Sequence, residues 1–204
     1  MAVPDSGFVE LGDTLTPTAR ALNGRGDPVP APVFWGALDT AVVAVVDTES
    51  GATWGKQVGS GRIQARVGTL RSNSVTLVVR PGLDSIKGDG DLRDTVTISS
   101  TPRDTLSDSL RIRVFVQRPA ALTDAQTLIR RRVTLQLTIF PGAGSSVTFV
   151  PDDTVFTNAG GIAVVQVRWD AGGLPDSVRV TARSTRHDGT SVPGDVNFVV
   201  EFRP

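Results

Sequence analysis

Short runs of alternating apolar and polar residues are the feature of this sequence that most limits its fold. In residues 61–67 every second side chain is apolar, and residues 109–116 repeat the pattern. A repeat of two residues is that of a β-strand with one buried face. No comparable stretch has helical spacing, so we predict a chain built from strands.

Strand signals rich in Val, Thr, Ile and Phe recur at short intervals and end at turn-forming residues. In the first half we predict strands at residues 13–22, 32–37, 41–46, 61–67 and 73–80. In the second half we predict strands at residues 94–99, 109–116, 132–140, 146–150, 162–169, 176–183 and 195–202. One segment, residues 120–131, fits a short helix capped by Thr123 and a long connecting loop equally well.

The charged residues support a chain of strands and loops. Of the 21 acidic residues 18 are Asp, and of the 21 basic residues 19 are Arg, so the helix formers Glu and Lys are rare. Residues 82–93 are dense in Gly and Asp and lack strand periodicity, which is typical of a linker. We therefore predict an all-β fold of two tandem β-sandwich domains, residues 1–81 and 94–204, joined by residues 82–93.

Charge and composition exclude several classes of function. The net charge is zero, and it is also balanced within residues 1–81, so no global field attracts nucleic acid or an anionic membrane. The one basic run, Arg130 to Arg132, would project to alternate faces of a strand. Neither a signal peptide nor a transmembrane segment is expected. The protein is then either cytoplasmic or a piece of a longer exported protein.

Both halves resemble bacterial immunoglobulin-like (Ig-like) domains. Residues 8–81 resemble the group-two kind through "FWGALDTAVVAVV" (34–46), "GSGRIQARVG" (59–68) and "SVTLVV" (74–79). Residues 94–204 are similar to the invasin/intimin-like kind through "VTLQLTIFPGAGSSVTFVPDDTVFTNAGGIAVVQV" (133–167), "SVRVTARS" (177–184) and "VNFVVEF" (196–202). The resemblance implies Ig-like β-sandwiches that serve as rods or binding units in cell-surface, secreted or phage-tail proteins.

This resemblance also implies a function. We expect a non-enzymatic structural or adhesion module of a larger exported bacterial surface protein, located outside the cell and acting as a rigid spacer or binding unit. Its expected partners are other modules of the same polypeptide or neighbouring subunits, and a surface glycan or protein receptor. Two alternatives remain: a carbohydrate-binding module, and a subunit of an extracellular filament assembled through open sheet edges.

Three short segments are candidate sites. Asp89, Asp91 and Asp94 crowd oxygen ligands onto the predicted linker. Such ligands suit calcium, and no other cofactor is expected, although a solvated hinge explains the three residues too. Trp54 is flanked by Gly and would stack on a sugar ring if exposed, whereas Trp35 and Trp169 are expected in the core or at its edge.

The third candidate is Arg25-Gly26-Asp27, the tripeptide that integrin receptors recognise. The Ig-like alignment places it between the strand ending at Leu22 and the next strand, where Gly, Asp and Pro also serve a turn. The sequence allows two roles for this tripeptide, adhesion to a receptor and a turn that serves folding alone. Catalysis is not expected, because His187 is the only histidine, lies in a predicted turn, and has no Cys or Tyr to act with.

Overall fold

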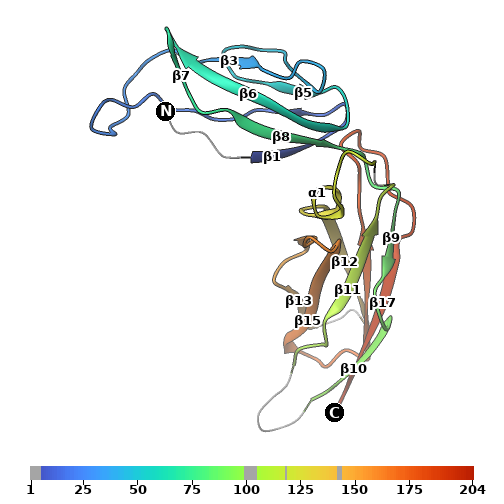
Figure 1. The fold of residues 1–204 in the computed structure, drawn as a ribbon. Coiled ribbons are helices and arrows are strands. Elements are labelled where there is room, and N and C mark those ends of the chain that lie inside the picture. The colour runs from blue at the N-terminus through green and yellow to red at the C-terminus, as the bar shows by residue number, and fades with distance from the viewer. Residues whose placement is uncertain (1–5, 99–104, 118, 142–143) are drawn as a thin grey trace. The chain divides into compact units, whose positions relative to one another are not determined.

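The computed structural model describes residues 6–98, 105–117, 119–141 and 144–204 of the chain. It divides into two compact units, Met1–Gly82 with Arg118–Thr127, and Leu83–Gln117 with Leu128–Pro204. Each unit is built from two β-sheets, as the ribbon shows (Figure 1). The all-β prediction is therefore confirmed, and the one helix among the described residues is the short α1 (Asp124–Leu128).

Unit 1 is a sandwich of a five-stranded and a three-stranded sheet. Its strands are β1 (Ser6–Glu10), β2 (Thr14–Leu15), β3 (Phe34–Ala37), β4 (Val43–Val45), β5 (Thr53–Gly55), β6 (Gly59–Val67), β7 (Leu70–Arg71) and β8 (Val75–Arg80). The larger sheet has the order β1-β8-β6-β3 with β7 beside β6, and the smaller has the order β2-β5-β4. Both sheets contribute to the core, which consists of Val9, Trp35, Val43, Ile63, Ala65, Val75, Leu77 and Val79.

Unit 2 is a larger sandwich of a five-stranded and a four-stranded sheet. Its strands are β9 (Ser85–Gly88), β10 (Arg93–Thr97), β11 (Leu110–Phe115), β12 (Arg132–Phe140), β13 (Ser145–Val150), β14 (Thr154–Phe156), β15 (Ile162–Gly172), β16 (Ser177–Arg183) and β17 (Val196–Arg203). The sheets have the orders β10-β17-β16-β12-β14 and β13-β15-β11-β9. Its core is rich in Val and includes Ile86, Leu110, Ile112, Trp169 and Phe198.

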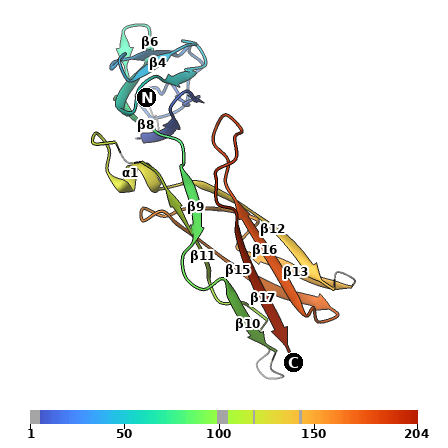
Figure 2. The same ribbon diagram turned by 90° about the vertical axis from the view of Figure 1, so that its right-hand side faces the viewer.

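Both units pair two strands that are far apart in the chain in the same unusual way. β1 runs parallel to β8, the last strand of unit 1, and β10 runs parallel to β17, the last strand of unit 2. Every other pair of described strands is antiparallel. Figure 2 shows β10 alongside β17 at the C-terminal end of the chain.

The structure corrects the predicted linker. Residues 82–93 contain β9, which pairs antiparallel with β11, and Ile86 of this strand is fully buried. All of this segment after Gly82 therefore belongs to unit 2. This strand has four residues with a single fully buried apolar side chain, and it ends at Gly88. Such a pattern is too short for a two-residue period to be seen.

Two other expectations are settled by local geometry. The strand predicted at residues 13–22 is reduced to β2, with isolated bridges beyond it. The segment 120–131 does contain a helix, and Thr123 caps it: Thr123 Oγ1 accepts from the Gln126 N–H at 3.3 Å, while Gln126 Oε1 accepts from the Thr123 N–H at 2.9 Å. This reciprocal pair is a capping box.

Candidate functional site

The Arg25-Gly26-Asp27 tripeptide lies at the tip of an exposed hairpin loop. The Asn23 N–H donates to the Asp27 carbonyl at 2.9 Å, and the Gly26 N–H donates to the Asn23 carbonyl at 3.0 Å. Gly26 has φ of 90°, which glycine adopts without steric cost. These features define a type I turn followed by a left-handed residue, a common short connection between antiparallel segments. Folding therefore explains the turn without any receptor.

One side chain organises the backbone of this loop. Oδ1 of Asn23 accepts hydrogen bonds from the Arg25 N–H at 2.8 Å and from the Asp27 N–H at 3.0 Å, and its Nδ2 donates to Asp27 Oδ2 at 3.2 Å. Residues 22–30 are all exposed. The loop thus holds its backbone in one conformation while both charged side chains of the tripeptide face solvent.

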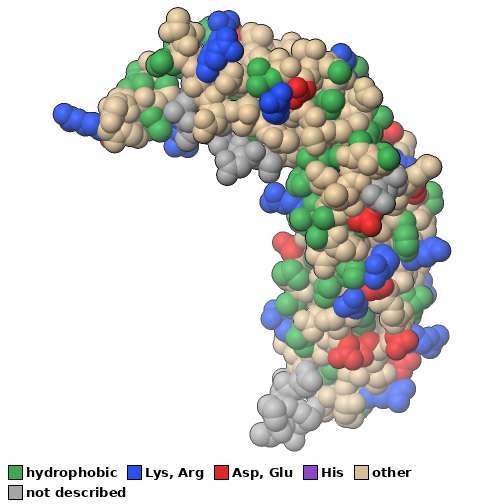
Figure 3. Space-filling model, in the orientation of Figure 1, with side chains coloured by type: hydrophobic (Ala, Val, Ile, Leu, Met, Phe, Trp, Pro, Cys, Tyr) green, Lys and Arg blue, Asp and Glu red, His purple; other side chains and the backbone are tan. Residues whose placement is uncertain are grey.

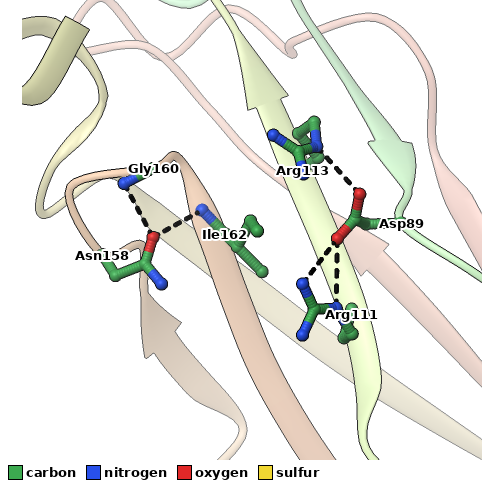
Figure 4. A network of polar contacts seen from close by, with 6 residues as sticks. All are labelled: Asp89, Arg111, Arg113, Asn158, Gly160 and Ile162. Carbon is green, nitrogen blue, oxygen red and sulfur yellow. Dashed lines mark hydrogen bonds and ion pairs between the residues drawn. The ribbon is translucent and has the colours of Figure 1, made fainter.

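The same loop recurs around Asn158 in unit 2. Oδ1 of Asn158 accepts from the Gly160 N–H at 2.9 Å and the Ile162 N–H at 3.1 Å (Figure 4). The backbone N–H of Asn158 donates to the Ile162 carbonyl at 2.9 Å, and the Gly161 N–H donates to the Asn158 carbonyl at 3.0 Å. Gly161 has φ of 75°. The two loops therefore share four hydrogen bonds and a left-handed glycine three residues after the asparagine, a motif that the sequence analysis missed.

A third loop has the same backbone without the asparagine. Arg186 N–H donates to the Thr190 carbonyl at 2.9 Å, and Gly189, with φ of 80°, donates to the Arg186 carbonyl at 3.0 Å. His187 occupies the second position of this loop and is exposed. The prediction that His187 lies in an exposed turn is confirmed.

Asp89, a predicted calcium ligand, is held by two arginines. Arg111 and Arg113 lie two residues apart on β11, so both point to the same face of the sheet. Arg113 Nε lies 2.8 Å from Asp89 Oδ1, and Arg111 Nη2 lies 2.9 Å from Asp89 Oδ2 (Figure 4). Hydrogen bonds from Arg113 and Arg111 hold the pKa of Asp89 below its ordinary value.

The other two predicted calcium ligands have different surroundings. Asp91 is exposed, whereas Asp94 Oδ2 accepts the Asp108 N–H at 2.8 Å. Within the described ranges, no three His, Cys, Asp or Glu side chains come close enough together to hold a metal ion. The structure thus does not bring Asp89, Asp91 and Asp94 together, and two guanidinium groups already neutralise the carboxylate of Asp89.

The three tryptophans divide into one exposed and two buried side chains. Trp54, the predicted sugar-stacking residue, is 41% exposed on β5, where its strand neighbours are Thr14 and Ala44. Trp35 and Trp169 are 4% and 7% exposed and belong to the two cores, as expected.

A hollow of about 610 Å³ lies in unit 2 beside β9 and the segment 193–197. Its charged lining residues are Lys87 and Asp195. The Lys87 ammonium lies 5.7 Å from the centre of the Phe115 ring, and Asp195 Oδ2 lies 2.7 Å from Arg183 Nε. The hollow therefore offers no pair of carboxyl groups and no histidine for acid–base catalysis.

The surface has no large area of one charge on the face shown in Figure 3, where basic and acidic side chains are interspersed. No helix in the part of the chain that the structure describes is both long and apolar enough to span a membrane.

Comparison with known proteins does not assign a family. No family profile matches the chain, and no curated protein sequence matches it. Among solved structures, domains 5–6 of the S-layer protein SbsC align over 100% of this chain and 97% of theirs, with 17% identity and a TM-score of 0.36. The adhesin InvE of Yersinia pseudotuberculosis aligns over 98% of this chain and 58% of its own, with 16% identity and a TM-score of 0.41. At scores this low the likeness bears neither on family nor on function.

Proposed function

We propose that this chain is a non-enzymatic structural module of a larger exported bacterial surface protein, in which its β-sandwiches form a spacer that carries tension. The parallel pairing of β10 with β17, and of β1 with β8, is the observation that carries this proposal. The bacterial and extracellular setting rests on the sequence resemblance to bacterial Ig-like domains. The absence of paired catalytic groups around the hollow beside β9 supports a non-enzymatic role.

The direction of the strands determines how tension acts on each pair. In unit 2, tension along the chain first meets the short β9, and beyond it pulls β10 towards its N-terminal end and β17 towards its C-terminal end. Because the two strands are parallel, these ends lie at opposite ends of the pair, and the pull runs along the strands. All the hydrogen bonds between them are then loaded together. A pair pulled apart from one end would instead lose its bonds one at a time.

Single-molecule force spectroscopy on unit 2 tests this mechanism. The chain has no cysteine, so two introduced cysteines define where the force is applied. Attachment through Asp91→Cys and Pro204→Cys loads the β10–β17 pair along the strands. Attachment through Asp91→Cys and Asn197→Cys, at one end of the pair, peels the strands apart. We expect a clearly higher unfolding force in the first geometry, and equal forces would contradict the proposed mechanism.

Adhesion through the Arg25-Gly26-Asp27 loop is the second candidate function. It is favoured by the exposure of Arg25 and Asp27 on a loop whose backbone is held by Asn23. Cell attachment to surfaces coated with the wild type or with Asp27→Glu tests it, since the longer side chain keeps the charge but moves it. Asp152→Glu, at another exposed aspartate, is the matched control. Equal attachment to all three proteins would remove this candidate.

A further inference from the structure

We propose that Asn23 is a site of chemical self-modification, at which the backbone nitrogen of Gly24 converts the asparagine into a cyclic imide and then into aspartate or isoaspartate. The proton on the Gly24 nitrogen passes to hydroxide, and the nitrogen attacks Cγ of Asn23. A C–N bond forms, the bond from Cγ to Nδ2 breaks, and Nδ2 leaves as ammonia after taking a proton from solvent. Water then opens either C–N bond of the imide, so water is the only other reactant.

The identity of residue 24 favours this reaction. Ring closure requires rotation about the Cα–C bond of Asn23 until the Gly24 nitrogen faces Cγ. A glycine at position 24 hinders that approach least because it has no Cβ. A Cβ built at Gly24 would meet no atom within 4 Å apart from those of its two chain neighbours. The surrounding protein therefore places no packing restraint on the reacting peptide.

The loop around Asn23 can also open at low cost. In the described part of the chain, residues 23–27 hydrogen-bond only to one another, and all five are exposed. Exposed loops with few outside contacts lie at the low end of local unfolding free energies. Opening this loop breaks its own bonds and disturbs no core residue.

The Asn158 loop allows a comparison within the same protein, because it shares four hydrogen bonds with the Asn23 loop but lacks both favourable features. Ala159 follows the asparagine, so the attacking nitrogen carries a residue with a Cβ. The loop is also anchored, since the Val114 N–H donates to the Gly161 carbonyl at 2.9 Å and Gly161 is buried. We therefore expect modification to be selective for Asn23.

Modification would change the loop in two ways. The neutral Nδ2 donor beside Asp27 Oδ2 is replaced by a carboxylate, which places two negative charges where a hydrogen bond stood. In the isoaspartate product the backbone also gains one carbon between residues 23 and 24, which alters the spacing that the Asn23–Asp27 bond requires. This inference does not depend on the proposed spacer or adhesion roles.

Peptide mapping by mass spectrometry after incubation in oxygen-18 water at mildly alkaline pH tests the proposal. The chain has asparagines at 23, 73, 158 and 197, which are all measured in one sample. We expect Asn23 to be modified about tenfold faster than Asn158 or more, with one oxygen-18 incorporated and isoaspartate among the products. Equal rates at Asn23 and Asn158 would overturn the proposal.

Two variants separate the contribution of the glycine from that of the fold. Gly24→Ala should slow Asn23 to a rate between those of wild-type Asn23 and Asn158, because its loop stays unanchored, and an unchanged rate would count against the imide mechanism. Ala159→Gly gives both loops an Asn-Gly pair. We expect Asn158 in this variant to react as fast as Asn23 in urea but more slowly in the folded protein. Equal rates in the folded protein would overturn the role assigned to anchoring by Val114.

Discussion

The backbone N–H of Leu11 donates a 2.9 Å hydrogen bond to the carbonyl oxygen of Arg80, one residue beyond the end of β1. Ile98 makes the equivalent bond to Arg203 at 2.7 Å, one residue beyond β10. In both units this bond closes the parallel pair at the end where the last strand finishes. It lies where tension on the C-terminal side would first reach the pair.

Replacing Leu11 by proline should weaken unit 1 under force. Leu11 is the second residue of a turn in which the Asp13 N–H donates to the Glu10 carbonyl at 3.0 Å, and the third residue, Gly12, has φ of 86°. Proline fits well at the second position of such a turn, which is that of Leu11. Leu11→Pro therefore removes the N–H and little else, whereas Leu11→Ala keeps it. We expect Leu11→Pro to lower the unfolding free energy by about 1 kcal/mol relative to Leu11→Ala. The unfolding force of Leu11→Pro should also be lower than that of Leu11→Ala. Equal forces would argue against a mechanical role for the bond from Leu11 to Arg80.

Substitution of Gly51 should disturb the core of unit 1. A Cβ at Gly51, where φ is 77°, would lie 2.6 Å from Cδ1 of the buried Trp35. Gly68 is the control, because its φ of 56° is also left-handed but an added Cβ meets nothing within 4 Å. We expect Gly68→Ala to cost about 1 kcal/mol from backbone strain and Gly51→Ala about 1–3 kcal/mol more from overpacking. Urea unfolding curves of the two variants measure this difference.

The ion pairs of Asp89 should stabilise unit 2 slightly and in a pH-dependent way. Because Arg113 and Arg111 lower the pKa of Asp89 in the folded state, its contribution is present above the unfolded value of about 3.9 and is lost as pH falls through the folded value. The urea midpoint of wild type should exceed that of Asp89→Asn near neutral pH. The gap should close on acidification and shrink at high salt. A gap that is independent of pH would contradict this explanation.

The calcium hypothesis and the ion pairs of Asp89 predict different responses to added calcium. A calcium site at Asp89, Asp91 and Asp94 would raise the thermal midpoint as calcium is added, by mass action. With Asp89 held by two arginines, we expect no such rise. A calcium-dependent rise that disappears in Asp91→Asn would restore the calcium hypothesis.

The exposed Trp54 can be tested as a sugar-binding residue without damage to the core. We expect Trp54→Ala to change the unfolding free energy by about 1 kcal/mol or less, whereas Trp35→Ala should cost about 3–5 kcal/mol. Glycan-array binding that is present in wild type and lost in Trp54→Ala would support a carbohydrate-binding module. Silence of the wild type on the array would count against it.

The longer strands were predictable because their alternation is mirrored in burial. Ile63 and Ala65 are fully buried while Arg62 and Arg66 are exposed, and β11 repeats this with Leu110 and its neighbours. Such a pattern can be read from a single strand, because it depends only on which face of that strand is buried. The all-β fold and most strands of unit 2 follow from it.

The short strands and the polar contacts were not predictable in the same way. β5, β9 and β14 have three or four residues each, so their strand character depends on partners that lie elsewhere in the chain. Asp89 meets Arg111 and Arg113 only because β9 pairs with β11. In isolation, an aspartate among glycines looks like a metal ligand or a hinge. The Asn23 and Asn158 loops could have been matched through their shared glycine, three residues after each asparagine.

The parallel pairing of an early strand with the last strand also constrains how each unit folds. The partner of β10 is β17, about a hundred residues later, so one edge of the larger sheet stays unpaired until the end of the unit has been synthesised. The loop that must close is long, and contacts of this kind slow folding. Until β17 has been made, β10 cannot join the larger sheet, because β17 lies between β10 and β16. Completion of β17 is therefore the step that completes the sandwich.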